Sequence, residues 1–289
     1  MPKVAIVTDS TAYLPSDIIE QYQISVVPQV LIWDGETLRD GIDIKADEFY
    51  VRLAKAEVMP TTSQAAVVDF KKIFERLSQA GHDILAVLVS EGLSGTVDSA
   101  RQAKAMLPEA NIEFVNSGTV AMELGFHVLA AARAAESGAS LKACKDVAED
   151  ARNRTGMVFA VETLEFLHRG GRIGTAARYL GTALQLKPIL TIADGLITPL
   201  ERVRTKRKSH QRLVELIAEL AVDYKKIKLA VIHANAAEDA QALLTAAEKT
   251  LKNVSETIFT GVSPIVGTHV GPGTVALAFM GEEKSPFLE

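Results

Sequence analysis

The sequence predicts a two-domain α/β protein, with a mostly parallel sheet between helices in residues 1–155 and an α+β domain in residues 156–289. Three observations lead to this fold class. Short apolar runs alternate with helical patterns in the first half, which is typical of βαβ units and a parallel sheet. Directly joined strands in the second half favour antiparallel pairs. The length of 289 residues is enough for two ordinary domains with substantial cores.

In the first half, valine- and isoleucine-rich runs indicate strands and apolar residues at helical spacing indicate helices. Pro15 fits the first position of a helix, and Gly138 follows the end of an alanine-rich one. The strands are expected at 4–8, 25–33, 84–89 and 112–115, and the helices at 15–22, 65–79, 93–107 and 120–136.

In the second half, the pattern changes near residues 153–157. Asp194-Gly195 joins two strand-like runs, and Asp-Gly is a strong hairpin signal. We therefore expect a mixed or antiparallel sheet of about six strands with two long helices. The strands are expected at 157–161, 187–192, 196–203, 229–233, 256–260 and 274–280, and the helices at 207–221 and 236–251.

The composition is that of an ordinary globular protein, with 48% apolar residues, 23% charged residues and a net charge of -5. It does not indicate a nucleic-acid-binding protein, and the basic run 202–208 is interpreted as a solvated helix start. No stretch is apolar for long enough to predict a transmembrane helix, and the N-terminus lacks a signal-peptide pattern. The single cysteine, Cys144, is expected to be a small buried residue, which suits a reducing cytoplasm.

Hydroxyl-rich clusters follow the predicted strands of the first half, where the carboxyl ends of strands and the amino ends of helices share one edge of a parallel sheet. Backbone N–H groups and hydroxyls at such an edge form an anion site, and the alternative is that these residues only cap helices. The clusters are Asp9-Ser10-Thr11, Thr61-Thr62-Ser63, Ser90 with Ser94-Gly95-Thr96, and Asn116-Ser117-Gly118.

Known cofactor motifs are absent: the chain has no P-loop, no dinucleotide-binding glycine pattern and no metal-ligand spacing. No cofactor or metal is therefore expected. The second half offers a basic, glycine-rich turn at 167–174, and Arg202 and Arg204 at a strand end. Its segment 267–273 is expected to be a rigid glycine-rich turn that carries His269 on a loop, where functional residues often lie.

These segments together resemble the DegV family of bacterial proteins over nearly the whole chain. Asn116 stands where the family often has Asp, and Asp98 is a second departure, which leaves the details of the ligand open. The resemblance rests on VTDSTAYLP at 7–15, PTTSQ at 60–64, LSGTVDSA at 93–100, LHRGGRI at 167–173, KPIL at 187–190 and GTHVGPG at 267–273.

The resemblance implies a fatty acid bound between two domains. It implies that the chain sequesters a long-chain fatty acid and presents the carboxylate to a separate kinase that forms the acyl-phosphate. By the same resemblance, Thr61, Thr62, Ser94, Gly95 and His269 hold the carboxylate. Arg172 and Arg202 then face the kinase or its nucleotide phosphates, and the chain contains no catalytic residue of its own.

Two other functions stay open on the sequence alone. The first is a hydrolase or transferase that uses Ser94 and His269, although no acid to orient the histidine is evident. The second is a regulatory protein in which bound lipid changes affinity for another protein.

Overall fold

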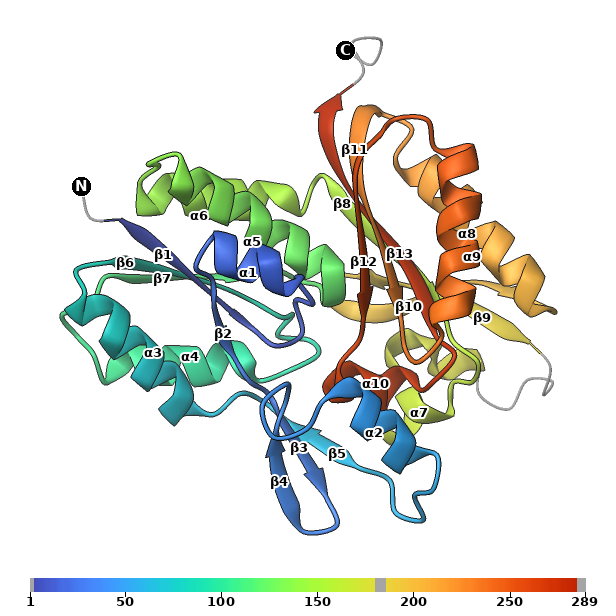
Figure 1. Ribbon diagram of the computed structural model, residues 1–289, viewed down its shortest axis with the longest axis horizontal. Coiled ribbons are helices and arrows are strands. Elements are labelled where there is room, and N and C mark those ends of the chain that lie inside the picture. Colours follow the sequence, from blue (N-terminus) through green and yellow to red (C-terminus); the bar gives the residue numbers. More distant parts are fainter. Residues whose placement is uncertain (1–2, 180–185, 285–289) are drawn as a thin grey trace. The chain divides into compact units, whose positions relative to one another are not determined.

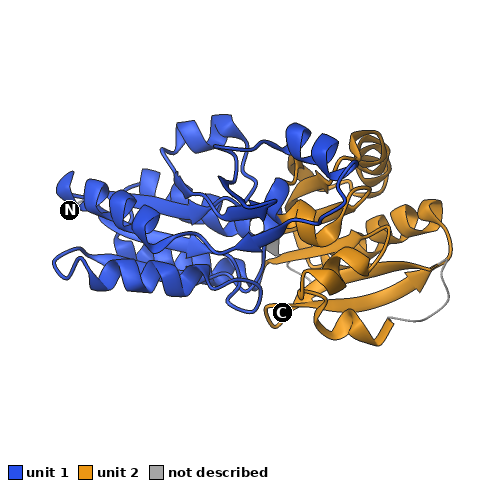
Figure 2. Ribbon diagram, turned by 90° about the horizontal axis from the view of Figure 1, so that it is seen from below, with its two compact units in different colours: residues 1–153, 263–265 blue, residues 154–262, 266–289 orange. Residues whose placement is uncertain are grey.

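The computed structural model of the chain describes residues 3–179 and 186–284. The chain divides into two compact units (Figure 2). The first comprises residues 1–153 and 263–265, and the second comprises residues 154–262 and 266–289. A short segment of the C-terminal half, residues 263–265, thus groups with the first unit.

A parallel sheet of four strands forms the centre of the first unit, in the order β2-β1-β6-β7. Helices cover both faces, which explains why these strands are continuous apolar runs (Figure 1). This confirms the predicted fold class of the first half. The strands are β1 (Val4–Asp9), β2 (Ser25–Val27), β6 (Asp83–Leu88) and β7 (Ile112–Asn116).

The helices α3 and α4 form one layer on the parallel sheet, and α5 and α6 form the other. Phe70 and Phe74 of α3 and Val97 of α4 are fully buried in one core with Val7 and Ile84 of the sheet. The helices α5 and α6 pack on the opposite face, against β1, β6 and β7 (Figure 1). The helices are α1 (Ser16–Gln21), α2 (Ala46–Leu53), α3 (Val67–Gln79), α4 (Thr96–Ala105), α5 (Ala121–Glu136) and α6 (Leu141–Ala151).

Cys144 lies on the buried face of α6 with an exposed fraction of 0%. Burial raises the pKa of its thiol. The residue is therefore a small core side chain, as the sequence indicated.

A small antiparallel sheet was not expected from the sequence. Its strands β3 (Val30–Trp33), β4 (Glu36–Arg39) and β5 (Thr61–Ser63) pair in the order β4-β3-β5. The predicted strand 25–33 is in fact two strands, since β2 ends at Val27 and β3 begins at Val30. Pro28 separates them, and it cannot donate to a sheet hydrogen bond.

The second unit contains a six-stranded mixed sheet in the order β10-β9-β8-β13-β11-β12. All neighbouring strands are antiparallel except β11 and β12, which confirms the predicted mixed sheet. Asp194 and Gly195 form the hairpin between β9 and β10 with positive φ angles of 50° and 77°. The strands are β8 (Thr155–Ala160), β9 (Lys187–Ala193), β10 (Leu196–Val203), β11 (Tyr224–His233), β12 (Val254–Gly261) and β13 (Val275–Lys284).

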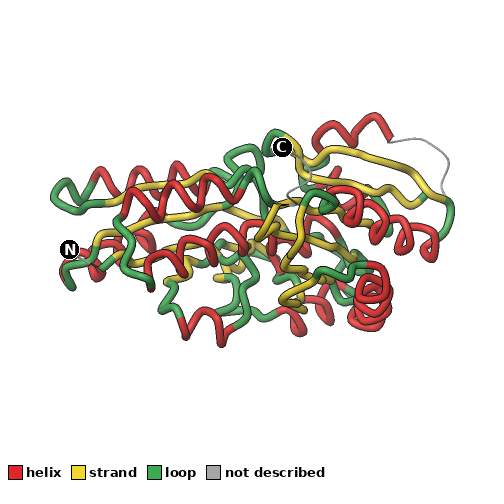
Figure 3. The backbone as a smooth tube through the Cα atoms, turned by 90° about the horizontal axis from the view of Figure 1, so that it is seen from above, coloured by secondary structure: helices red, strands yellow, loops and turns green. Residues whose placement is uncertain are grey.

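Two long helices, α8 (Lys206–Leu220) and α9 (Ala237–Thr250), cover one face of this sheet. Their residues Leu213 and Leu243 are buried against Leu229 and Leu277 of the central strands. Figure 3 shows the helices in red beside the strands in yellow. The short helical segments α7 (Glu165–Arg169) and η1 (Gly174–Tyr179) also belong to this unit. The short helix α10 (Pro264–Val270) begins in the first unit and continues into the second.

Candidate functional site

Asp9 organises the carboxyl edge of the first sheet. Its carboxylate is completely buried, and its Oδ1 accepts hydrogen bonds from the Thr11 N–H at 3.0 Å, the Thr11 hydroxyl at 2.5 Å and the Gln29 side-chain amide at 3.1 Å. Its Oδ2 accepts from the Val89 N–H at 2.8 Å. The predicted Asp9-Ser10-Thr11 cluster therefore binds an internal anion, the Asp9 side chain, rather than an external one.

Two further hydroxyl-rich positions also serve local turns. Asn116 Oδ1 accepts from the N–H groups of Glu91 and Gly118, at 3.2 and 3.1 Å. Ser117 Oγ accepts from the Thr119 N–H, and Ser90 Oγ accepts from the Gly92 N–H. These side chains stabilise turns and do not cap the helices that follow, because the N-caps of α4 and α5 are Gly95 and Val120.

The loop before α3 and the loop before α4 lie against each other. The Gln64 amide donates to Ser99 Oγ at 3.2 Å, and the Ala65 N–H lies 3.4 Å from Thr96 Oγ1. A Cβ on Gly95 would come within 2.5 Å of Gln64 Oε1, so only glycine fits there without a shift of Gln64. Gln64, which directly follows β5, thus lies against Gly95, and that Thr61, Thr62, Ser94 and Gly95 bind one carboxylate stays a prediction.

The start of α4 combines the features of an anion site. The helix begins at Thr96, three residues later than predicted, so Ser94 and Gly95 precede it and are partly exposed. Gly95 is the N-cap and has no side chain to satisfy the N–H groups of the first turn. Ser94 Oγ forms a 2.8 Å hydrogen bond with Thr96 Oγ1. Free N–H groups, a helix dipole and hydroxyls together favour a carboxylate or phosphate.

His269 lies in the second unit, near the basic glycine-rich turn. The segment 267–273 was predicted to be a turn, but its first part is helical, because α10 continues to Val270 and includes His269. A Cβ on Gly170 would lie 2.1 Å from His269 Nδ1, and one on Gly271 would lie 2.4 Å from Phe166. The close packing of the two segments, made possible by these glycines, accounts for the difference.

Electrostatics keep His269 neutral at pH 7. Burial lowers the pKa of its ring to about 4, and the positive charge of Arg172 adds to the effect. Arg172 itself is partly buried, and its guanidinium donates to the Gly170 carbonyl at 2.8 Å. The imidazole is therefore suited to hydrogen bonding rather than to a full ion pair.

Arg202, on β10, is exposed, and its guanidinium lies 4.5 Å from the centre of the Tyr179 ring. Ser94 belongs to the first unit and His269, Arg172 and Arg202 to the second. That Ser94 and His269 receive the same carboxylate stays a prediction.

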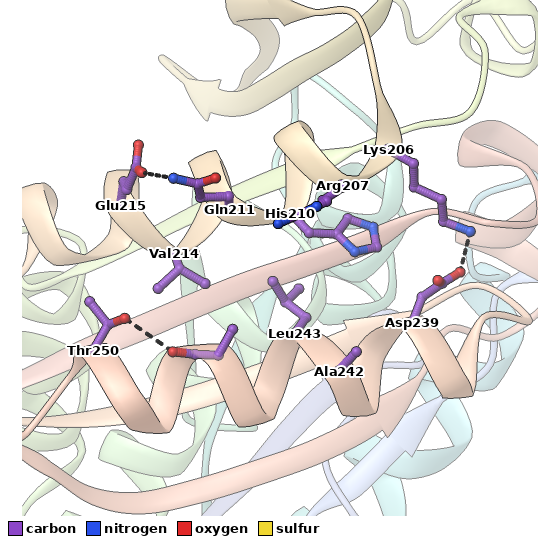
Figure 4. A pocket seen from close by; sticks show the side chains of 11 residues that line it. Lys206, Arg207, His210, Gln211, Val214, Glu215, Asp239, Ala242, Leu243 and Thr250 are labelled. Carbon is purple, nitrogen blue, oxygen red and sulfur yellow. Dashed lines mark hydrogen bonds and ion pairs between the residues drawn. The ribbon is translucent and has the colours of Figure 1, made fainter.

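A separate pocket of about 720 Å³ lies between α8 and α9 (Figure 4). Val214 and Leu243 contribute apolar surface, and Lys206 pairs with Asp239 at one end. The basic run 202–208 is thus the end of a strand and the exposed start of a helix, as interpreted from the sequence. Sequence reasoning did not indicate this pocket, because its lining residues belong to two ordinary amphipathic helices.

The described part of the chain comprises residues 3–179 and 186–284. Its helices include none that is both long and apolar enough to cross a membrane. Its His, Cys, Asp and Glu side chains do not gather in groups of three that could hold a metal ion.

The fold and these segments define a two-unit α/β protein with hydroxyl- and glycine-rich segments. The DegV family model matches residues 3–282, and the chain belongs to the DegV family. A DegV domain-containing protein from Halalkalibacterium halodurans is 36% identical over 280 residues, which cover 96% of this chain and 99% of that protein. One from Staphylococcus aureus is 33% identical over 283 residues, covering 97% and 98%.

Solved structures of the family have the same fold. A fatty-acid-binding DegV family protein from Thermus thermophilus is 30% identical, with a TM-score of 0.92 over 97% of this chain and 100% of that chain. DegV from Bacillus subtilis, described as a fatty acid binding protein, is 31% identical, with a TM-score of 0.88 over 98% and 100%.

Replacing Asp9 should destabilise the first unit. Asp9→Ala leaves four donors of the buried edge without their acceptor, so we expect a loss of at least about 2 kcal/mol in the free energy of unfolding. Urea unfolding followed by fluorescence of Trp33, the single tryptophan and a core residue of this unit, measures the loss. Asp98→Asn, at an exposed carboxylate, should change it by less than about 0.5 kcal/mol. An Asp9→Ala protein as stable as wild type would contradict the role of Asp9.

The low pKa of His269 predicts acid sensitivity of the second unit. Between its ordinary value of 6.5 and its folded value of about 4, the unfolded chain binds a proton that the folded chain does not. Stability should therefore fall as pH decreases through this range. Hydrogen exchange of the β13 amides, compared at pH 7 and pH 5, measures this loss of stability. The loss should be smaller in His269→Gln than in the wild type, and Arg172→Ala should reduce it by less than His269→Gln does. Equal losses in wild type and His269→Gln would contradict the assignment.

Proposed function

We propose that this protein binds a long-chain fatty acid and presents its carboxylate to a separate kinase, which forms the acyl-phosphate. The observation that carries the proposal is the similarity over nearly the whole chain to DegV proteins described as binding fatty acids. The reducing cytoplasm, where a kinase finds ATP, is the proposed place of action, and the free, buried Cys144 suits it.

The head group is proposed to bind at the start of α4. A carboxylate that leaves water needs several donors to offset its loss of hydration. Thr61 and Thr62 on β5, and Ser94 and the N–H groups after Gly95 at the start of α4, are donors of this kind. The residues directly after β5, Gln64 and Ala65, form hydrogen bonds with α4. We propose that His269, as a neutral imidazole, supplies a further hydrogen bond. The acyl tail contributes about 0.8 kcal/mol for each buried CH₂ group, which favours long chains.

The chemistry of Ser94 and His269 favours a carrier over a hydrolase or transferase. A general base is most effective when its pKa lies near the working pH, whereas burial lowers the pKa of His269 to about 4. The hydrogen bond of Ser94 Oγ is made with Thr96 Oγ1. A burst of product from an activated ester, lost in Ser94→Ala, would instead support the enzyme.

Lipid should remain bound through purification. Mass spectrometry of freshly purified, denatured protein is expected to find a fatty acid, and added fatty acid should raise the unfolding temperature of delipidated protein. Repeated extraction without lipid, together with no thermal shift, would rule out the carrier function.

The head-group residues should distinguish an acid from an alcohol. Ser94→Ala and Thr62→Ala are each expected to weaken fatty-acid binding by about 1–3 kcal/mol, because each removes a donor to a charged group. Binding of the fatty alcohol of equal length should change less. Ser137→Ala, which removes an exposed hydroxyl after α5, is the matched control. Equal losses for acid and alcohol would mean that these hydroxyls only support the loops.

The two arginines should separate presentation from binding. Arginine suits phosphate or carboxylate recognition because its planar fork donates two parallel hydrogen bonds. Arg172→Ala and Arg202→Ala should keep fatty-acid affinity within about tenfold, or roughly 1.4 kcal/mol, and reduce acyl-phosphate formation by a cognate kinase and ATP much more. His269→Ala should reduce both. The exposed Arg101→Ala is the control. Full turnover in both arginine variants, or collapse of their lipid binding, would refute this division.

A further inference from the structure

A buried hydrogen-bond chain connects β4 to the segment before α10, outside the residues discussed above. Asp40 follows β4 and is only 3% exposed. Its Oδ2 accepts from the Ser263 hydroxyl at 2.7 Å, and the Tyr13 hydroxyl lies 3.0 Å from Ser263 Oγ. All three residues belong to the first unit.

The number of available protons determines which group donates and which accepts in each of these hydrogen bonds. Ser263 has one hydroxyl proton, and it is donated to the carboxylate of Asp40. Tyr13 must then donate to Ser263 Oγ. An ionised Asp40 can only accept, which fixes the order Tyr13 to Ser263 to Asp40, whereas a protonated Asp40 can also donate and reverse it.

The hydrogen-bond chain can restrain α10 because of where Ser263 lies in the sequence. Ser263 directly precedes Pro264, the first residue of α10, and α10 carries Thr268 and His269. Residues 263–265 are also the segment of the C-terminal half that groups with the first unit. A restraint on Ser263 is therefore a restraint on where α10 begins.

We propose that Asp40 is a positioning residue that, through Ser263 and Tyr13, holds the start of α10 and thereby places His269 for the carboxylate ligand. The part that concerns the ligand rests on the proposed function. The anchoring of α10 does not, so the two can fail separately.

The surroundings of Asp40 make the anchor sensitive to pH. Burial raises the pKa of Asp40 to about 6, the negative charge of Asp9 on β1 adds to this, and hydrogen bonds from Ser10 and Ser263 oppose it. Tyr50 on α2 also faces it, and its pKa is raised by burial and by the charge of Asp40. Since the folded pKa exceeds the ordinary 3.8, ionisation of Asp40 costs stability as pH rises from about 4 to about 6.

The direct test is hydrogen exchange in α10. Ser263→Ala and Tyr13→Phe should each accelerate exchange of the α10 amides, with about a tenfold effect for Ser263→Ala, because a hydrogen bond to a charged group is lost. Ser255→Ala is the matched control, since Ser255 donates to the Glu282 carboxylate on the surface of the second unit and should leave α10 unchanged. Wild-type exchange in Ser263→Ala would overturn the proposal, and accelerated exchange would support it.

A titration separates positioning from bulk stability. The amide signals of Thr268 and His269 in nuclear magnetic resonance spectra should shift with a midpoint near pH 6 in the wild type. They should not do so in Asp40→Asn, which keeps the shape but cannot ionise. If Asp40→Asn does not fold, Ser263→Ala, which should lack the same shift, decides the question. A wild-type midpoint in Asp40→Asn, or in Ser263→Ala if Asp40→Asn does not fold, would overturn the proposal.

Fatty-acid affinity tests the ligand part. Ser263→Ala should weaken binding about fivefold or more, whereas Ser255→Ala should leave it unchanged. A loosened α10 with wild-type affinity would overturn the role of Asp40 in ligand placement. If the wild-type chain binds no fatty acid, the proposed function and the ligand part fail together, while exchange and titration still decide whether Asp40 anchors α10.

Discussion

The buried carboxylate of Asp9 is the interaction on which the functional edge of the first unit depends. A charge removed from water is tolerated only when donors surround it, and Asp9 has four. Those donors come from the turn after β1, from Gln29 before β3 and from Val89 after β6. Gln29 in turn accepts the backbone N–H of Asp40. One buried carboxyl group thus joins the turn after β1, the residues between β2 and β3, and the end of β6.

The regular parts of the fold were predictable because burial leaves a pattern. Strand β6 is buried on both faces and reads as an uninterrupted apolar run, and the Asp194-Gly195 hairpin needs the positive φ angles that this pair adopts readily. The small sheet leaves no such pattern. Strand β4 is mostly exposed and β5 consists of hydroxyl residues, so both are strands only because β3 supplies their partners.

For the candidate site, the sequence predicts residue types and positions, but not which partner each group has. Ser117 and Ser94 look alike in the sequence, both being hydroxyls after a strand. Only the folded structure shows that Ser117 caps a turn, while Ser94 precedes a helix without a side-chain cap. Gln64, which donates to Ser99 of α4, belongs to the PTTSQ segment but carries no signal of its own in the sequence. His269 was expected on a loop, because glycine and proline beside it favour turns, and packing against Gly170 overrides that preference.

The burial of Cys144 has a consequence for how the protein responds to thiol reagents. Because the thiolate is the reactive form, a core position with a raised pKa keeps the folded chain as inert as one without cysteine. Alkylation of this residue then requires α6 to separate from the sheet, so its rate reports the opening of one helix. A cysteine introduced on the surface would be modified first, and a spectroscopic label could be attached there without removing the native residue.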